Sequence, residues 1–162
     1  MWIARQVQPL IRRMAKQFPA VLITGARQTG KTSLLRQLYP NASYLTLDLP
    51  ANAEAARTAP DELLARYPPP VIIDEIQYAP SLLRHLKVRI DRDRFPGRYL
   101  LTGLQVFPLM HGVSESLAGR CAVLNLHTFA RAELLAAGRA IEEPRYLFLG
   151  GYPELHLGVD PD

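Results

Sequence analysis

The sequence predicts an α/β fold, with a mainly parallel sheet of about five strands and helices on both of its faces. Two observations carry this prediction. Short apolar runs rich in β-branched residues alternate with stretches of helical periodicity, a pattern typical of parallel strands joined by right-handed crossovers. One of these runs, at 20–24, leads directly into the glycine-rich stretch 25–32, which a helical segment follows. The 162 residues, of which 48% are hydrophobic, suffice for one compact domain.

An amphipathic helix is expected over residues 1–19, ahead of the first strand. Its apolar positions recur at steps of three and four residues, with Arg and Lys between them. These positions are Ile3, Val7, Leu10, Met14 and Phe18. Pro9 falls inside the pattern, and a proline removes a hydrogen bond from a helix, so we expect a kink or a late start.

The other elements follow from apolar runs and turn signals along the chain. We expect strands at 20–24, 43–48, 71–74, 98–102 and 121–126. We expect helices at 32–38, 51–67 and 81–93, the second loosened by Pro60 and the third capped by Ser81. The core domain is expected over 20–150. Residues 151–162 have too little apolar periodicity to close a domain, so we expect them to begin a linker to a missing C-terminal domain.

Bulk composition limits the classes of protein to which the chain can belong. Cys121 is the single cysteine, which excludes an internal disulfide framework and fits a reducing cytoplasm. No apolar run approaches 18 residues, so we expect no membrane partner. The formal net charge is +4, but the basic residues are scattered, so nucleic acid remains only an open alternative as a partner. The four histidines show no metal-ligand spacing.

The stretch Gly25–Thr32 matches the phosphate-loop pattern G-x-x-x-x-G-K-[ST] between a predicted strand and a predicted helix. Glycines let successive N–H groups curl around phosphate oxygens, and the helix turns its positive end toward the same anion. We expect Lys31 to contact the β- and γ-phosphates, and the Thr32 hydroxyl to bind Mg²⁺. The predicted phosphate-binding residues are Gly25, Ala26, Arg27, Gln28, Thr29, Gly30, Lys31, Thr32 and Ser33. The sequence therefore predicts a P-loop nucleotide-binding domain that takes ATP with Mg²⁺.

Two adjacent carboxylates follow the third predicted strand. Asp74 and Glu75 come directly after Val71-Ile72-Ile73, at the sheet edge where the phosphate loop is also expected. We expect Asp74 to hold magnesium through water, and Glu75 to polarise an attacking water as general base. A glutamate beside the aspartate favours hydrolysis over phosphoryl transfer to a small acceptor.

Further candidate residues follow the fourth predicted strand and precede the fifth. Thr102 and Gln105 are candidates for contact with the γ-phosphate; the alternative is a strand that ends in a glycine turn without such a contact. Arg120 is a candidate arginine finger, acting in cis or by self-association across a subunit interface. The alternative for Arg120 is a structural salt bridge.

With these residues placed, the chain resembles the AAA-type ATPases of bacteria and archaea that are usually described only as ATP-binding proteins. Chains of that family normally continue into a C-terminal domain of unknown function with a nuclease-like fold. The resemblance implies a motor portion that hydrolyses Mg-ATP to drive or switch such an effector. It rests on the strings at 25–32, 47–48, 74–80, 96–103, 114–120 and 150–154. One departure is Leu104, where the family usually has serine, and this puts the γ-phosphate sensor in question.

Two other functions compete with a motor that drives an effector. The segments 74–77 and 103–105 resemble helicase motifs, which indicates the first motor domain of a DNA translocase, although no second motor domain is present. The other alternative is an interaction module that binds ATP without cleaving it. A GTPase is disfavoured because no Asn-Lys-x-Asp string occurs.

Overall fold

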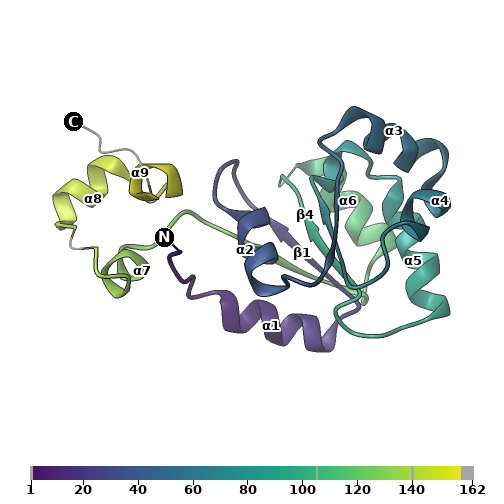
Figure 1. Cartoon of the computed structure of the whole chain (residues 1–162), viewed down its shortest axis with the longest axis horizontal. Coiled ribbons are helices and arrows are strands. Elements are labelled where there is room, and N and C mark those ends of the chain that lie inside the picture. Colours follow the sequence, from purple (N-terminus) through teal and green to yellow (C-terminus); the bar gives the residue numbers. More distant parts are fainter. Residues whose placement is uncertain (1, 105, 140, 158–162) are drawn as a thin grey trace.

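The computed structural model describes residues 2–104, 106–139 and 141–157. Its centre is a five-stranded sheet with the order β2-β3-β4-β1-β5, in which every neighbouring pair is parallel (Figure 1). The strands are β1 (Ala20–Thr24), β2 (Ser43–Thr46), β3 (Val71–Asp74), β4 (Tyr99–Thr102) and β5 (Cys121–Asn125). The predicted α/β fold with a parallel sheet of about five strands is therefore confirmed.

Helices cover both faces of this sheet. On one face α1 (Gln8–Gln17) and α2 (Lys31–Leu38) pack against β1, β3, β4 and β5, through residues such as Ile11, Leu34 and Leu35. On the other face lie α3 (Pro50–Thr58), α4 (Pro60–Ala65), the 3₁₀ turn η1 (Ile76–Tyr78), α5 (Leu82–Arg92) and α6 (Phe107–Ser116). Alternate residues of the central strands feed the two cores, because successive side chains of a strand point to opposite faces.

Three short helices follow β5 and lie beside the N-terminal segment, away from the sheet (Figure 1). They are α7 (Arg131–Ala136), α8 (Glu143–Leu149) and α9 (Pro153–Leu157). A small separate core joins α7 and α8 to the start of the chain: Ile3 packs with Phe129 and with Leu134 of α7, and Tyr146 of α8 packs against this cluster. Residues from the two ends of the chain thus share one apolar cluster.

The structure confirms one sequence-based expectation about the helices and corrects others. The first helix begins only at Gln8 with Pro9 in its first turn, so the late start is confirmed, and Ile3 packs against α7 instead of extending the helical stripe. Ser81 precedes α5 but makes no side-chain cap, because its backbone is already helical.

The helices α6 to α9 were not predicted, and α9 lies within 151–162, the segment that was expected to begin a linker. Gln105 and 158–162 lie outside the described residues.

No helix within the described part of the chain is long and apolar enough to cross a membrane.

Candidate phosphate-binding site

Three strands carry the predicted site residues to one edge of the sheet. β1 leads into the glycine loop, β3 ends at Asp74, and β4 ends at Thr102. Because the strands are parallel, their carboxyl ends meet at the same edge, the edge at which open α/β sheets bind ligands. β4 lies between β1 and β3, so the end of β4 stands between the loop and the acidic pair.

The backbone of the loop requires glycine at its two ends. Gly25 has a φ of +145°, and a Cβ added there would lie 2.3 Å from the carbonyl oxygen of Leu126, just beyond β5. Gly30 has a φ of +88° and precedes the first turn of α2, whose positive N-terminal end therefore adjoins the loop. These backbone angles explain why the pattern has glycine at both positions, because other residues rarely adopt them.

Lys31 lies buried inside the curl of its own loop. Its Nζ donates hydrogen bonds to the carbonyl oxygens of Gly25, at 3.2 Å, and Ala26, at 2.7 Å. Burial lowers the pKa of the Lys31 ammonium, and the nearby carboxylates of Glu75 and Asp74 oppose this shift. The loop therefore surrounds a partly desolvated cation, a suitable environment for binding phosphate oxygens.

Asp74 is the centre of a hydroxyl cluster. Its Oδ1 accepts hydrogen bonds from the Thr32 hydroxyl, at 2.6 Å, and from the Thr102 hydroxyl. Its Oδ2 accepts a hydrogen bond from the Tyr44 hydroxyl at 3.0 Å. Burial, followed by the neighbouring Asp74 charge, raises the pKa of Tyr44. The structure thus brings together Thr32 and Asp74, which were predicted from sequence as a metal pair.

The oxygen atoms of this pair suit a hard cation such as Mg²⁺. Mg²⁺ prefers oxygen ligands and usually binds through one or two protein groups, water molecules and substrate phosphates. Within the described ranges, no group of three or more His, Cys, Asp or Glu side chains could form an all-protein metal site. A hydroxyl and a carboxylate beside a phosphate loop therefore match the way in which Mg²⁺ is held with a nucleotide.

Two neighbouring side chains, those of Thr102 and Gln77, orient Glu75. Its backbone has a left-handed conformation, with φ +58°, and its N–H donates to the Thr102 hydroxyl at 3.1 Å. Its carboxylate accepts a hydrogen bond from the side-chain amide of Gln77. The Gln77 carbonyl oxygen in turn accepts from the N–H of Leu104 at 3.1 Å. Gln77 was not predicted as a site residue, although its spacing two residues after Glu75 was a signal for it.

Thr102 is fully buried, and its hydroxyl both donates to Asp74 and accepts from the Glu75 N–H. It joins the two acidic residues and fixes their relative position. A direct contact of Thr102 with a γ-phosphate stays a prediction. Gly103, the next residue, allows the close approach of Gln77, because a Cβ there would lie 2.9 Å from Oε1 of Gln77.

The structure does not bring Arg120 to the phosphate loop of its own chain. Arg120 precedes β5, and its carbonyl oxygen accepts from the N–H of Ala20, at the opposite end of β1 from the loop. Its guanidinium bonds both carboxylate oxygens of Asp91, at 2.6 and 3.0 Å, and this ion pair raises the pKa of Arg120. The expectation of a finger in cis is therefore wrong, and a finger in trans stays a prediction.

An open cavity of about 510 Å³ adjoins the loop. Gly25, Ala26 and Thr29 of the loop line it, together with Leu104, which follows β4 by two residues. Tyr152, from the turn before α9, also lines it. The cavity therefore borders both the phosphate loop and the C-terminal helices.

Comparison with known proteins agrees with this geometry. Residues 17–135 match the family described as AAA domain. The uncharacterized protein Rv2008c of Mycobacterium tuberculosis is 37% identical over 123 residues, which make up 75% of this chain and 28% of that protein. The chain thus spans little more than a quarter of the length of this curated relative.

Two solved structures share the fold. The Walker-type ATPase PABY2304 of Pyrococcus abyssi superposes with a TM-score of 0.59 at 16% identity, over 94% of this chain and 65% of that one. The signal transduction ATPase PH0952 of Pyrococcus horikoshii, which carries a tetratricopeptide repeat sensor, gives 0.54 at 17% identity, over 94% and 28%. At these identities the likeness concerns the fold alone.

Proposed function

Since the chain belongs to the AAA domain family, whose members are P-loop ATPase domains, we propose that it binds Mg-ATP at the glycine loop and hydrolyses it. The observation that carries the proposal is the hydrogen bond of 2.6 Å between the hydroxyl of Thr32 and the carboxylate of Asp74, next to the buried ammonium of Lys31. A metal-binding hydroxyl, a carboxylate and a cation in contact with a glycine loop are the parts that phosphoryl transfer requires.

In this proposal the loop binds the phosphates and Lys31 exchanges partners. Its ammonium leaves the carbonyl oxygens of Gly25 and Ala26 and contacts the β- and γ-phosphates instead. Backbone N–H groups of the loop and of the first turn of α2 donate to the same oxygens. Because Lys31 is already buried, little further desolvation of the ammonium is needed.

Thr32 and Asp74 are the residues that would hold Mg²⁺. When bound, the ion neutralises charge that develops on the transferred phosphoryl group. Tyr44 and Thr102 fix the orientation of the Asp74 carboxylate through their hydroxyl groups. The carboxylate is therefore held in place by the protein itself.

Glu75 is the general base of the proposed reaction. Its carboxylate accepts a proton from water while the water oxygen attacks the γ-phosphorus, and the bond from that phosphorus to the β,γ-bridging oxygen breaks. The products are ADP, inorganic phosphate and the proton held by Glu75. Gln77 and Thr102 hold the side chain and the backbone of Glu75, respectively, so that the base is positioned before water arrives.

We further propose that turnover drives or switches an attached effector domain. This extension is supported by the curated relative, which has more than three times the matched length, because 28% of it aligns. Release of phosphate from Mg-ATP by the purified chain, lost in Glu75→Gln while nucleotide binding persists, tests the catalytic part. Binding without any release in the unaltered chain would instead favour a non-hydrolysing ATP-dependent module.

A further inference from the structure

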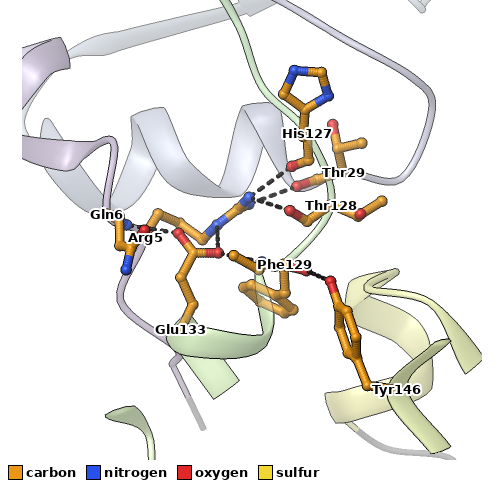
Figure 2. Close-up of polar contacts among 9 residues, drawn as sticks. Arg5, Gln6, Thr29, His127, Thr128, Phe129, Glu133 and Tyr146 are labelled. Atoms are coloured by element: carbon orange, nitrogen blue, oxygen red, sulfur yellow. Dashed lines mark hydrogen bonds and ion pairs between the residues drawn. The ribbon is translucent and has the colours of Figure 1, made fainter. Parts of the chain in front are cut away.

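A buried arginine lies behind the phosphate loop and has no part in the proposed reaction. Arg5 belongs to the segment before α1 and is only 6% exposed. Figure 2 shows its guanidinium surrounded by groups from three separate parts of the chain. Nη1 donates to the carbonyl oxygen of Thr29 at 3.0 Å, and Nη2 donates to those of His127 and Thr128 at 2.6 and 3.0 Å.

The contact with Thr29 constrains the loop itself. A peptide unit is planar and trans, so its C=O and N–H point in opposite directions. The carbonyl of Thr29 faces Arg5, and the N–H of Gly30, in the same peptide unit, therefore points away from the guanidinium. That N–H belongs to the loop amides that the proposed function assigns to phosphate binding. Arg5 thus fixes the direction of one of these donors.

The other partner of Arg5 belongs to the C-terminal helices. Its Nε forms an ion pair of 3.1 Å with Oε2 of Glu133 in α7, and Glu133 is as buried as Arg5. The Glu133 carboxylate also accepts from the N–H groups of Gln6, at 2.6 Å, and Ala130, at 3.0 Å. A carboxylate with these three partners binds the segment before α1 to the beginning of α7.

Phe129 extends this link toward α8 and α9. The guanidinium of Arg5 lies 4.7 Å from the centre of the Phe129 ring. The backbone of Phe129 donates to the carbonyl of Gly151 at 2.7 Å and accepts from the Tyr146 hydroxyl at 2.8 Å, the latter contact being visible in Figure 2. Tyr152, next to Gly151, lines the same cavity as the loop residues. The C-terminal helices therefore approach the nucleotide site both through Arg5 and across the cavity.

We propose that Arg5 is a positioning residue that couples the phosphate loop to the helices α7–α9, through its hydrogen bond to Thr29 and its ion pair with Glu133. This inference rests on the proposed nucleotide binding. A change in the orientation of the Thr29–Gly30 peptide on phosphate binding alters its hydrogen bond with the Arg5 guanidinium. The ion pair between Arg5 and Glu133 transmits that change to α7. By linkage, the factor by which bound nucleotide favours the packed state of α7 equals the factor by which release of α7 weakens nucleotide binding.

Hydrogen exchange of the whole chain, with and without saturating Mg-ATPγS, measures the coupling. We expect the nucleotide to slow exchange in the loop and also in peptides from 131–157 of the unaltered chain. Arg5→Lys keeps the charge but loses the planar fork that contacts Glu133 and Thr29 together. In this variant the slowing at 131–157 is lost, and affinity for Mg-ATPγS falls about tenfold, a coupling within the usual range.

A matched control separates coupling from general loss of packing. Arg98, like Arg5, pairs with a carboxylate, that of Asp93, and its guanidinium lies 4.7 Å from the ring centre of Phe95, but it precedes β4 at the opposite edge of the sheet from the loop. Arg98→Lys should leave both the affinity and the response at 131–157 unchanged. Glu133→Gln, which keeps the size and an oxygen acceptor, provides a second variant if Arg5→Lys does not fold, and it should also lose the response.

The outcomes distinguish the two proposals. If the unaltered chain binds Mg-ATPγS without any change at 131–157, the coupling is overturned while nucleotide binding stands. A folded Arg5→Lys variant with unaltered affinity and an unaltered response at 131–157 overturns the role of Arg5. If the unaltered chain binds no nucleotide, the proposed function fails, and this inference fails with it.

Discussion

The hydroxyl of Thr32 lies 2.6 Å from Oδ1 of Asp74, although 42 residues separate them in sequence. The contact joins the first turn of α2 to the end of β3. It exists because β1, which leads into the loop, and β3, which ends at Asp74, run parallel in one sheet and end at the same edge. The proposed nucleotide site is thus assembled by the sheet topology.

Lys31→Ala should reduce affinity for Mg-ATP by at least about tenfold, because a hydrogen bond to a charged group contributes about 1.5–3 kcal/mol. Isothermal titration calorimetry measures the dissociation constant. Lys16→Ala removes an exposed lysine of α1 and should leave affinity unchanged. Equal affinities of the Lys31→Ala variant and the unaltered chain would remove the phosphate-loop assignment.

Thr102→Val should lower the free energy of unfolding by about 1–3 kcal/mol, because the Glu75 N–H loses its partner and Asp74 loses a buried donor. Thr102→Ser keeps the hydroxyl and should recover most of this loss. Urea denaturation followed by circular dichroism gives both values. A Thr102→Val variant as stable as the unaltered chain would show that the hydroxyl does not hold the acidic pair together.

Gln77→Met, which keeps the length of the side chain, should reduce kcat by up to about 10²-fold while the dissociation constant for Mg-ATP stays the same. The change removes the hydrogen bonds to the Glu75 carboxylate and to the Leu104 N–H, but no residue that is expected to bind phosphate or metal. Steady-state phosphate release and calorimetry separate the two quantities. If Gln77→Met weakened binding and left kcat intact, Gln77 would act on the nucleotide and not on the base.

Arg120→Ala distinguishes an interface role from a structural one. If Arg120 supplies a finger in trans, turnover per chain should rise with protein concentration over a hundredfold range, and Arg120→Ala should abolish that rise. Asp91→Ala breaks the same ion pair and serves as the matched control. Turnover that is independent of concentration, with the same small loss of melting temperature in both variants, would assign Arg120 to the Asp91 salt bridge alone.

Local patterns were sufficient to predict the strands and the loop. The apolar run Val71–Asp74 and the glycines of the loop specify their conformations through their own residues, and the structure places them accordingly. Arg5 could not be recognised as part of the site, because its partners lie 24 to 128 residues away. The helices α7 and α8 were missed for a similar reason, since part of their apolar cluster comes from Ile3 at the other end of the chain.

The central claim is that Glu75 activates water against a bound Mg-ATP, and single-turnover hydrolysis by Glu75→Gln tests it most directly. We expect the variant to bind Mg-ATP with the affinity of the unaltered chain and to release phosphate about 10² to 10⁴ times more slowly, the effect of losing a positioned general base. Glu62→Gln, at an exposed position of α4, should hydrolyse ATP at the rate of the unaltered chain. Hydrolysis by Glu75→Gln at that same rate would contradict the account.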